Sequence, residues 1–196
     1  MMLFSQLGNS QQNSEQIIID SKLSFSEAIA DTKAPKEVID NLVLLDVEYY
    51  SFDKKLHRGQ LIIHKGLKKD ILEIFEFIKS SKFPIDKVIP IVKYNWSDDA
   101  SMLDNNTSSF NYRKVAGKSK LSNHSFGTAI DINPFINPAV YSDGKISPKG
   151  SKYIPTADGA INDDCTLTRE FKKHGWTWGG DWNSLKDYQH FEKPLQ

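Results

Sequence analysis

The chain has 196 residues, of which 39% are hydrophobic and 26% charged, a composition typical of one soluble globular domain. Its 25 basic and 25 acidic residues give a formal net charge of zero, so no overall field favours nucleic acid or an anionic membrane. The single cysteine, Cys165, excludes an intrachain disulfide and a cysteine-based zinc site, and no apolar run reaches transmembrane length.

The N-terminal segment, residues 1–14, is rich in Ser, Gln and Asn and predicts a flexible tail before a domain at 15–196. It lacks the charged start and apolar stretch of a signal peptide, so no signal peptide is visible. Either the protein is not exported by that route, or a signal has been removed. Residues 15–40 have a mixed pattern that predicts partly helical structure.

The next elements follow from changes in hydrophobic period. Alternation over 42–52 predicts a strand, and the apolar run 60–64 predicts a second strand after a polar turn. Apolar residues at helical spacing from Leu67 to Ile78 predict a helix whose apolar face belongs to the core. A third apolar run, 88–92, is weakened as a strand by Pro90, and a polar loop with at most one helical turn is expected at 97–109.

The second half of the chain predicts short elements separated by loops. Residues 133–163 form a long irregular connection, of a kind that is often functional. Residues 176–183 form a turn rich in Trp and Gly. We expect strands at 110–114, 129–132 and 188–192 and a helix at 166–174 that ends at Gly175. Strands and helices mixed in this order predict one small α+β domain.

Two short segments hold candidate metal ligands. The first contains His124 and Asp131, seven residues apart with Gly127 between them, and the second contains His190. Catalytic zinc takes three ligands from His and carboxylates and keeps one position for water, so these side chains would supply one complete set. A turn at Gly127 would bring the first two onto one ion. Spacing alone also fits core histidines and turn aspartates, so the site is a hypothesis.

A hydrolase also needs a base for the water that zinc activates. Asp187 lies three residues before His190, where a turn into a strand would place its carboxylate beside the metal without ligating it. We therefore expect one acid to bind the ion and the other to move protons.

These motifs resemble a known family. The pattern Ser-x-His-x-x-Gly-x-Ala-x-Asp at 122–131, followed by acid-x-x-His-Phe at 187–191, is similar to the VanY-like zinc D-Ala-D-Ala carboxypeptidases. Phe110 to Arg113, Ile132 to Pro134 and Trp178 to Trp182 also look familial, so the resemblance covers about residues 40–193. Aspartate rather than glutamate at 187 resembles the branch that contains L-alanyl-D-glutamate endopeptidases.

The resemblance implies one zinc ion on His124, Asp131 and His190, with Asp187 as the catalytic acid/base. It implies that Arg113 holds the substrate carbonyl or its oxyanion and that Ser122 lies near the bound substrate. The implied fold is a small α+β domain with an antiparallel sheet and flanking helices, shared with the Hedgehog signalling domain. The implied substrate is the peptidoglycan stem peptide, cleaved by a monomer in the cell envelope.

Several interpretations stay open. Arg113 also fits a structural salt bridge, Ser122 fits a turn hydroxyl, and Trp178 fits either packing or one wall of a substrate groove. The cut could be removal of a terminal D-Ala by a carboxypeptidase or endopeptidase cleavage within the stem. A non-catalytic zinc-binding cell-wall or signalling module, or an α+β domain without metal, are the alternatives to an enzyme.

Overall fold

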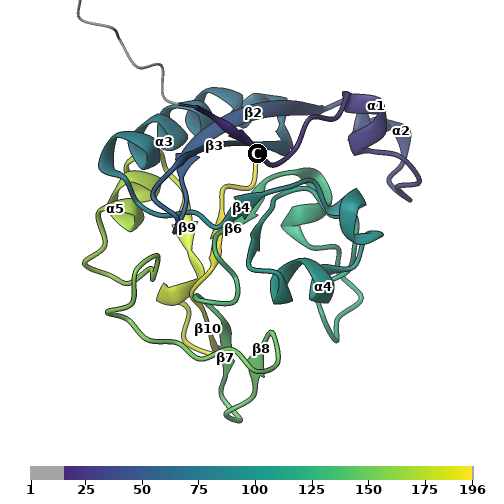
Figure 1. Ribbon diagram of the computed structural model, residues 1–196. Coiled ribbons are helices and arrows are strands. Elements are labelled where there is room, and N and C mark those ends of the chain that lie inside the picture. The colour runs from purple at the N-terminus through teal and green to yellow at the C-terminus, as the bar shows by residue number, and fades with distance from the viewer. Residues whose placement is uncertain (1–15, 196) are drawn as a thin grey trace, which may run out of the picture.

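The computed structural model describes residues 16–195, so the tail expected at 1–14 lies outside the described residues. Within the described part, short helices and mostly antiparallel strands in four small sheets form one domain, which confirms the α+β class (Figure 1). No helix of the described part is long and apolar enough to cross a membrane.

The largest sheet is built on a long hairpin. Strands β2 (Leu42–Tyr50) and β3 (Leu56–His64) pair antiparallel over their whole lengths, and β1 (Ile18–Ile19) adds to β3 in parallel. The Asp53 carboxylate accepts the Lys55 N–H at 2.9 Å in the connecting turn. The predicted strand at 42–52 is confirmed, and the second strand begins earlier than the expected residue 60.

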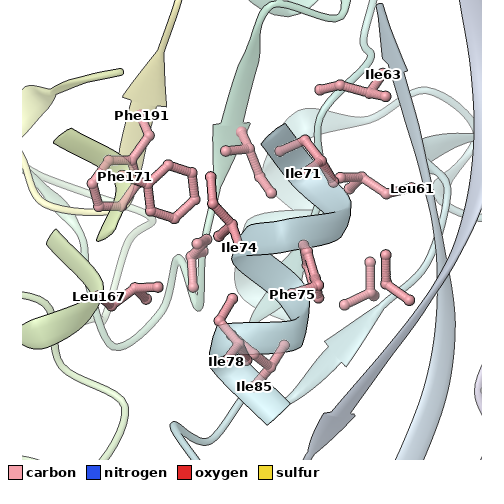
Figure 2. Close-up of a cluster of buried hydrophobic side chains, with 14 of the residues drawn as sticks. Leu61, Ile63, Ile71, Ile74, Phe75, Ile78, Ile85, Leu167, Phe171 and Phe191 are labelled. Atoms are coloured by element: carbon pink, nitrogen blue, oxygen red, sulfur yellow. The ribbon is translucent and has the colours of Figure 1, made fainter. Parts of the chain in front are cut away.

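Helix α3 (Lys68–Ser81) lies along this hairpin (Figure 1). Its buried side chains recur at the predicted helical spacing, and Figure 2 shows them between the strand residues Leu61 and Ile63 and the rings of Phe171 and Phe191. Each fully buried side chain of this size contributes about 1.5–3 kcal/mol by leaving water. The buried helical residues are Ile71, Ile74, Phe75 and Ile78.

A second sheet connects this core to the candidate site. Strand β11 (His190–Glu192) pairs antiparallel with β6 (Ala129–Asp131) on one side and with β9 (Thr177–Trp178) on the other. Phe191 stacks on Phe171 of helix α5 (Thr166–Lys173), with ring centroids 3.9 Å apart. Helix α5 ends at Lys173 with His174 as its C-cap, and the left-handed Gly175 follows, as the predicted end at Gly175 required.

The remaining elements are short. Residues 133–163, expected to be irregular, contain the small strands β7 and β8, and β10 joins them at the end of the molecule away from α3 (Figure 1). Four 3-10 helices, at Lys65–Leu67, Ile91–Tyr94, Asn123–Phe126 and Gly179–Asp181, complete the described part. The other bounds are α1 Phe25–Ala28, α2 Lys36–Ile39, α4 Asp98–Leu103, β4 Lys87–Val88, β5 Asn106–Thr107, β7 Ala139–Tyr141, β8 Ile146–Ser147 and β10 Leu185–Asp187.

Two predicted strands differ from the structure. The run 88–92 divides at Pro90, because β4 ends at Val88 and a 3-10 helix follows the proline, which has no N–H for a ladder. Residues 110–114 form no named strand. Their N–H groups bond to scattered partners, such as Asn111 to the carbonyl of His124 and Arg113 to the hydroxyl of Ser125, so no regular ladder forms.

Candidate metal centre

His124 is presented by a 3-10 turn, Asn123–Phe126, that is fixed at both ends. The Ser122 hydroxyl accepts the His124 N–H at 3.3 Å at the start of the turn. Gly127 ends it in the left-handed region at φ 63°. A Cβ on Gly127 would lie 2.7 Å from the backbone nitrogen of His64, so both the dihedral and the close approach require glycine. The predicted backbone role of Gly127 is therefore confirmed.

Strand pairing brings the other two candidate ligands together. Asp131 and His190 are direct partners in the β6–β11 register. Alternate residues of a strand point to opposite faces, and the neighbours Ile130 and Phe191 are fully buried in the core. The core therefore holds both strands while Asp131 and His190 face the same side.

The three predicted ligands converge. Their ligand atoms all lie within 4.8 Å of one another, and all three residues are buried. His124 Nε2 lies 3.1 Å from Asp131 Oδ2 and 3.2 Å from His190 Nδ1, and His190 Nδ1 lies 2.9 Å from Asp131 Oδ1. Ligands at zinc bond lengths of ~2.0–2.2 Å in a tetrahedron stand ~3.3 Å apart, so the separations fit one shared ion.

Hydrogen bonds on the outer sides of both rings select the nitrogens that face inward. His124 Nδ1 lies 2.6 Å from the carbonyl oxygen of Ser109 and donates to it, which leaves Nε2 with a lone pair toward the centre. His190 Nε2 lies 3.0 Å from Glu192 Oε2, so Nδ1 faces the centre. Two ring nitrogens and a carboxylate directed at one point form a donor set suited to a cation.

The pKa shifts of Asp131 and His190 also show that the three side chains interact strongly. Burial by itself would raise the pKa of Asp131, but His124 and His190 outweigh it and hold that pKa well below its ordinary value. Burial would likewise lower the pKa of His190, yet its hydrogen bonds to Asp131 and Glu192 raise it to about 10. A cation that binds here must therefore displace a tightly held proton.

Asp187 lies beside this cluster at the end of β10, where its strand partner is Ala139. Its Oδ1 is buried and has no hydrogen-bond partner among the described residues. Burial is the largest influence on its carboxyl group and raises the pKa to about 6, and the charge of Asp131 adds to the rise. The carboxyl group thus titrates close to neutrality, which suits proton transfer.

Arg113 faces the same space. Its Nη2 lies 2.9 Å from Asp98 Oδ2 of helix α4, and its Nε has no partner among residues 16–195. The salt bridge that the sequence left open is therefore present. It engages Nη2, while Nη1 lies 3.5 Å from the carbonyl oxygen of Lys114 and the unpartnered Nε is buried.

A cavity of about 530 Å³ joins these groups. All three candidate ligands, Asp187 and Arg113 line it, together with the exposed lysines Lys118 and Lys120. This volume is in the range of sites that hold small molecules or short peptides.

Ser122 and Trp178, both expected near the substrate, make contacts within the protein instead. Ser122 is buried and lines the cavity, but its oxygen caps the turn of His124, so its contact with substrate stays a prediction. Trp178 is only 2% exposed, packs in the core and donates its indole N–H to the carbonyl of Tyr188 at 2.9 Å. This corrects its assignment as a substrate contact, and Trp182 lines the cavity instead.

Sequence reasoning missed three polar residues at the site. Glu192 Oε2 accepts from His190 Nε2 and, at 2.7 Å, from Asn123 Nδ2. Gln189 is 2% exposed, lines the cavity, and has an unpartnered Oε1 among the described residues. Glu192 lies two residues after His190 on one strand, so alternation would have placed both side chains on one face.

Comparison with known proteins agrees with the motifs. Residues 116–193, which contain all three candidate ligands and Asp187, match the family described as D-alanyl-D-alanine carboxypeptidase. Over these residues the match agrees with the family resemblance, and it supports a peptidase. No solved structure matches the chain.

Proposed function

We propose that this protein, whose residues 116–193 match the D-alanyl-D-alanine carboxypeptidase family, is a zinc-dependent peptidase that hydrolyses stem peptides of peptidoglycan. The observation that carries the proposal is the convergence of His124, Asp131 and His190 at a cavity that also contains a buried carboxyl group with raised pKa. A purely structural zinc site is closed by four protein ligands and has no use for such a group.

Each residue has a distinct part in the proposed reaction. Bound by the three ligands, zinc would lower the pKa of a coordinated water and polarise the substrate carbonyl. Asp187 takes the proton from the attacking water and returns it to the leaving amine, so one carboxyl group serves as base and then as acid. Arg113 donates to the carbonyl oxygen as negative charge develops there, while Asp98 holds the guanidinium in place.

The cavity also offers cations to the free carboxylates of a stem peptide. Lys118 and Lys120 lie exposed along the lining, which also contains the carboxylates of Asp98, Asp99 and Glu192. Peptidoglycan as the substrate implies action in the cell envelope. The chain would act as a monomer, since every group named here comes from one chain.

Two cuts are supported by different observations. The matched family description favours removal of a terminal D-Ala, whereas aspartate at position 187 favours cleavage between L-Ala and D-Glu. Incubation with defined muropeptides, followed by mass spectrometry of the products, distinguishes them because each cut releases a fragment of different mass.

The same assay tests the proposal as a whole. Product should appear with zinc-loaded protein, disappear with a chelator, and return when zinc is added back. Asp187→Ala should abolish product while zinc stays bound. A purified protein that binds zinc but leaves every muropeptide intact would support the alternative of a non-catalytic zinc-binding module.

A further inference from the structure

Glu192 contacts the outer nitrogen of a candidate metal ligand. Its Oε2 lies 3.0 Å from His190 Nε2, on the side of the ring opposite the nitrogen that faces Asp131. Glu192 is therefore excluded as a fourth ligand of the same ion, and the described group of convergent ligand atoms does not contain it. Its carboxylate acts on the ring and not on the ion.

Asn123 fixes the position of that carboxylate. Its Nδ2 donates to the same Oε2 at 2.7 Å, so one oxygen accepts from both the amide and the imidazole. Asn123 immediately precedes His124 in the turn, whereas Glu192 follows His190 on β11. The contact thus joins the two segments that carry the histidines, which are distant in sequence.

An imidazole with one protonated nitrogen can bind a metal only through the other. A carboxylate that accepts from Nε2–H keeps the proton there, leaves the lone pair on Nδ1, and increases the electron density available to the ion. For His124, the acceptor of the outer N–H is the backbone carbonyl of Ser109, which side-chain substitution cannot remove. For His190, the acceptor is a side chain, so a substitution can test its effect on the ring.

We propose that Glu192, held by Asn123, is a positioning residue that fixes His190 with Nδ1 toward the metal and so sets the metal affinity of the site. This inference rests on the proposed zinc site. It assigns to the chain two residues that neither bind the ion nor touch the reacting atoms.

The chain offers a matched control for this contact. In helix α5, Glu170 Oε1 lies 3.1 Å from His174 Nε2, a pair of the same chemistry and similar length away from the site. Both glutamates are mostly buried, with side chains 22% and 14% exposed. Glu170→Ala therefore measures what loss of such a contact costs the fold without any effect on the metal.

The test is zinc affinity, measured by competition with a chromophoric chelator, of wild type, Glu192→Ala, Glu192→Gln and the control Glu170→Ala. We expect Glu192→Ala to weaken zinc binding by about 10- to 100-fold and Glu170→Ala to leave it unchanged. Glu192→Gln should recover part of the loss, because its amide oxygen still accepts from Nε2–H without a charge. Asn123→Ala should give a smaller loss than Glu192→Ala.

A second readout concerns the proton itself. Long-range proton–nitrogen NMR of the zinc-loaded protein should show His190 protonated at Nε2 and bound through Nδ1 in wild type, and a mixture of the two nitrogens in Glu192→Ala. Wild-type zinc affinity in both Glu192 variants, or an unchanged His190 tautomer, would overturn the inference. Failure of wild type to bind zinc would instead refute the proposed function, so the two failures are distinguishable.

Discussion

Asp187 is expected to reduce the stability of the metal-free protein. Its Oδ1 is buried without a partner among the described residues, and burial raises its pKa from 3.8 to about 6. A carboxyl group whose pKa is higher in the folded than in the unfolded state stabilises the fold when protonated. This contribution is complete below pH 3.8 and is lost as the pH rises through about 6.

Removal of the ionisable group should therefore stabilise the fold at neutral pH. The difference of about two pKa units corresponds to ~3 kcal/mol at pH 7.5 and to roughly half of that at pH 5. We treat ~3 kcal/mol as an upper limit, because the side chain as a whole is partly exposed and water screens its outer oxygen. Asp187→Asn keeps the shape of the side chain and cannot ionise, so it should show this gain.

Urea unfolding of chelator-treated protein at pH 5 and pH 7.5 measures the effect. Asp187→Asn should have the higher free energy of unfolding at both pH values, with the larger gain at pH 7.5, while zinc-loaded turnover falls by ~10²–10⁴-fold. Asp158→Asn removes an exposed carboxylate and controls for the loss of one negative charge. An Asp187→Asn variant no more stable than wild type at pH 7.5 would refute the burial argument.

Four further outcomes are expected. His124→Ala should lose bound zinc, as metal analysis of the purified variant will show, and normal zinc content would contradict the ligand assignment. Because the pKa of His190 is about 10, zinc binding should release a proton between pH 6 and 8, so the zinc dissociation constant should rise about 10-fold per unit fall in pH; a pH-independent constant would argue against this. Gly127→Ala should lower the free energy of unfolding by ~1–3 kcal/mol more than Gly117→Ala, since both glycines have positive φ but only the first meets backbone atoms; equal losses would mean that the close approach to His64 is unimportant. Arg113→Lys should keep zinc and lower kcat/KM by ~10²-fold, and full activity would remove the guanidinium from the reaction.

The sequence by itself determined the elements with a strong hydrophobic period. The alternation of β2 and the helical spacing of Ile71, Ile74 and Ile78 in α3 each record which side of an element meets the core, so both were predicted correctly. The motifs around His124 and His190, through their resemblance to a known family, also named the three side chains that converge in the structure as candidate ligands.

The sequence could not assign residues whose roles depend on partners distant along the chain. The sequence left Trp178 open between core packing and a wall of the substrate groove, and the packing of β9 against β11 shows that its ring belongs to the core. Residues 110–114 looked like a strand, yet their N–H groups find partners in the turn of His124 and elsewhere.

Tertiary structure alone decided the electrostatics of the site. The raised pKa of Asp187 comes from burial beside Asp131, and the orientation of His190 comes from its contact with Glu192. Charges and hydrogen bonds here join residues that are distant in sequence and a few ångströms apart in space, whereas hydrophobic periodicity involves residues that are close in sequence. For this reason the sequence predicted the main elements, while the pKa of Asp187 and the contact between Glu192 and His190 required the tertiary structure.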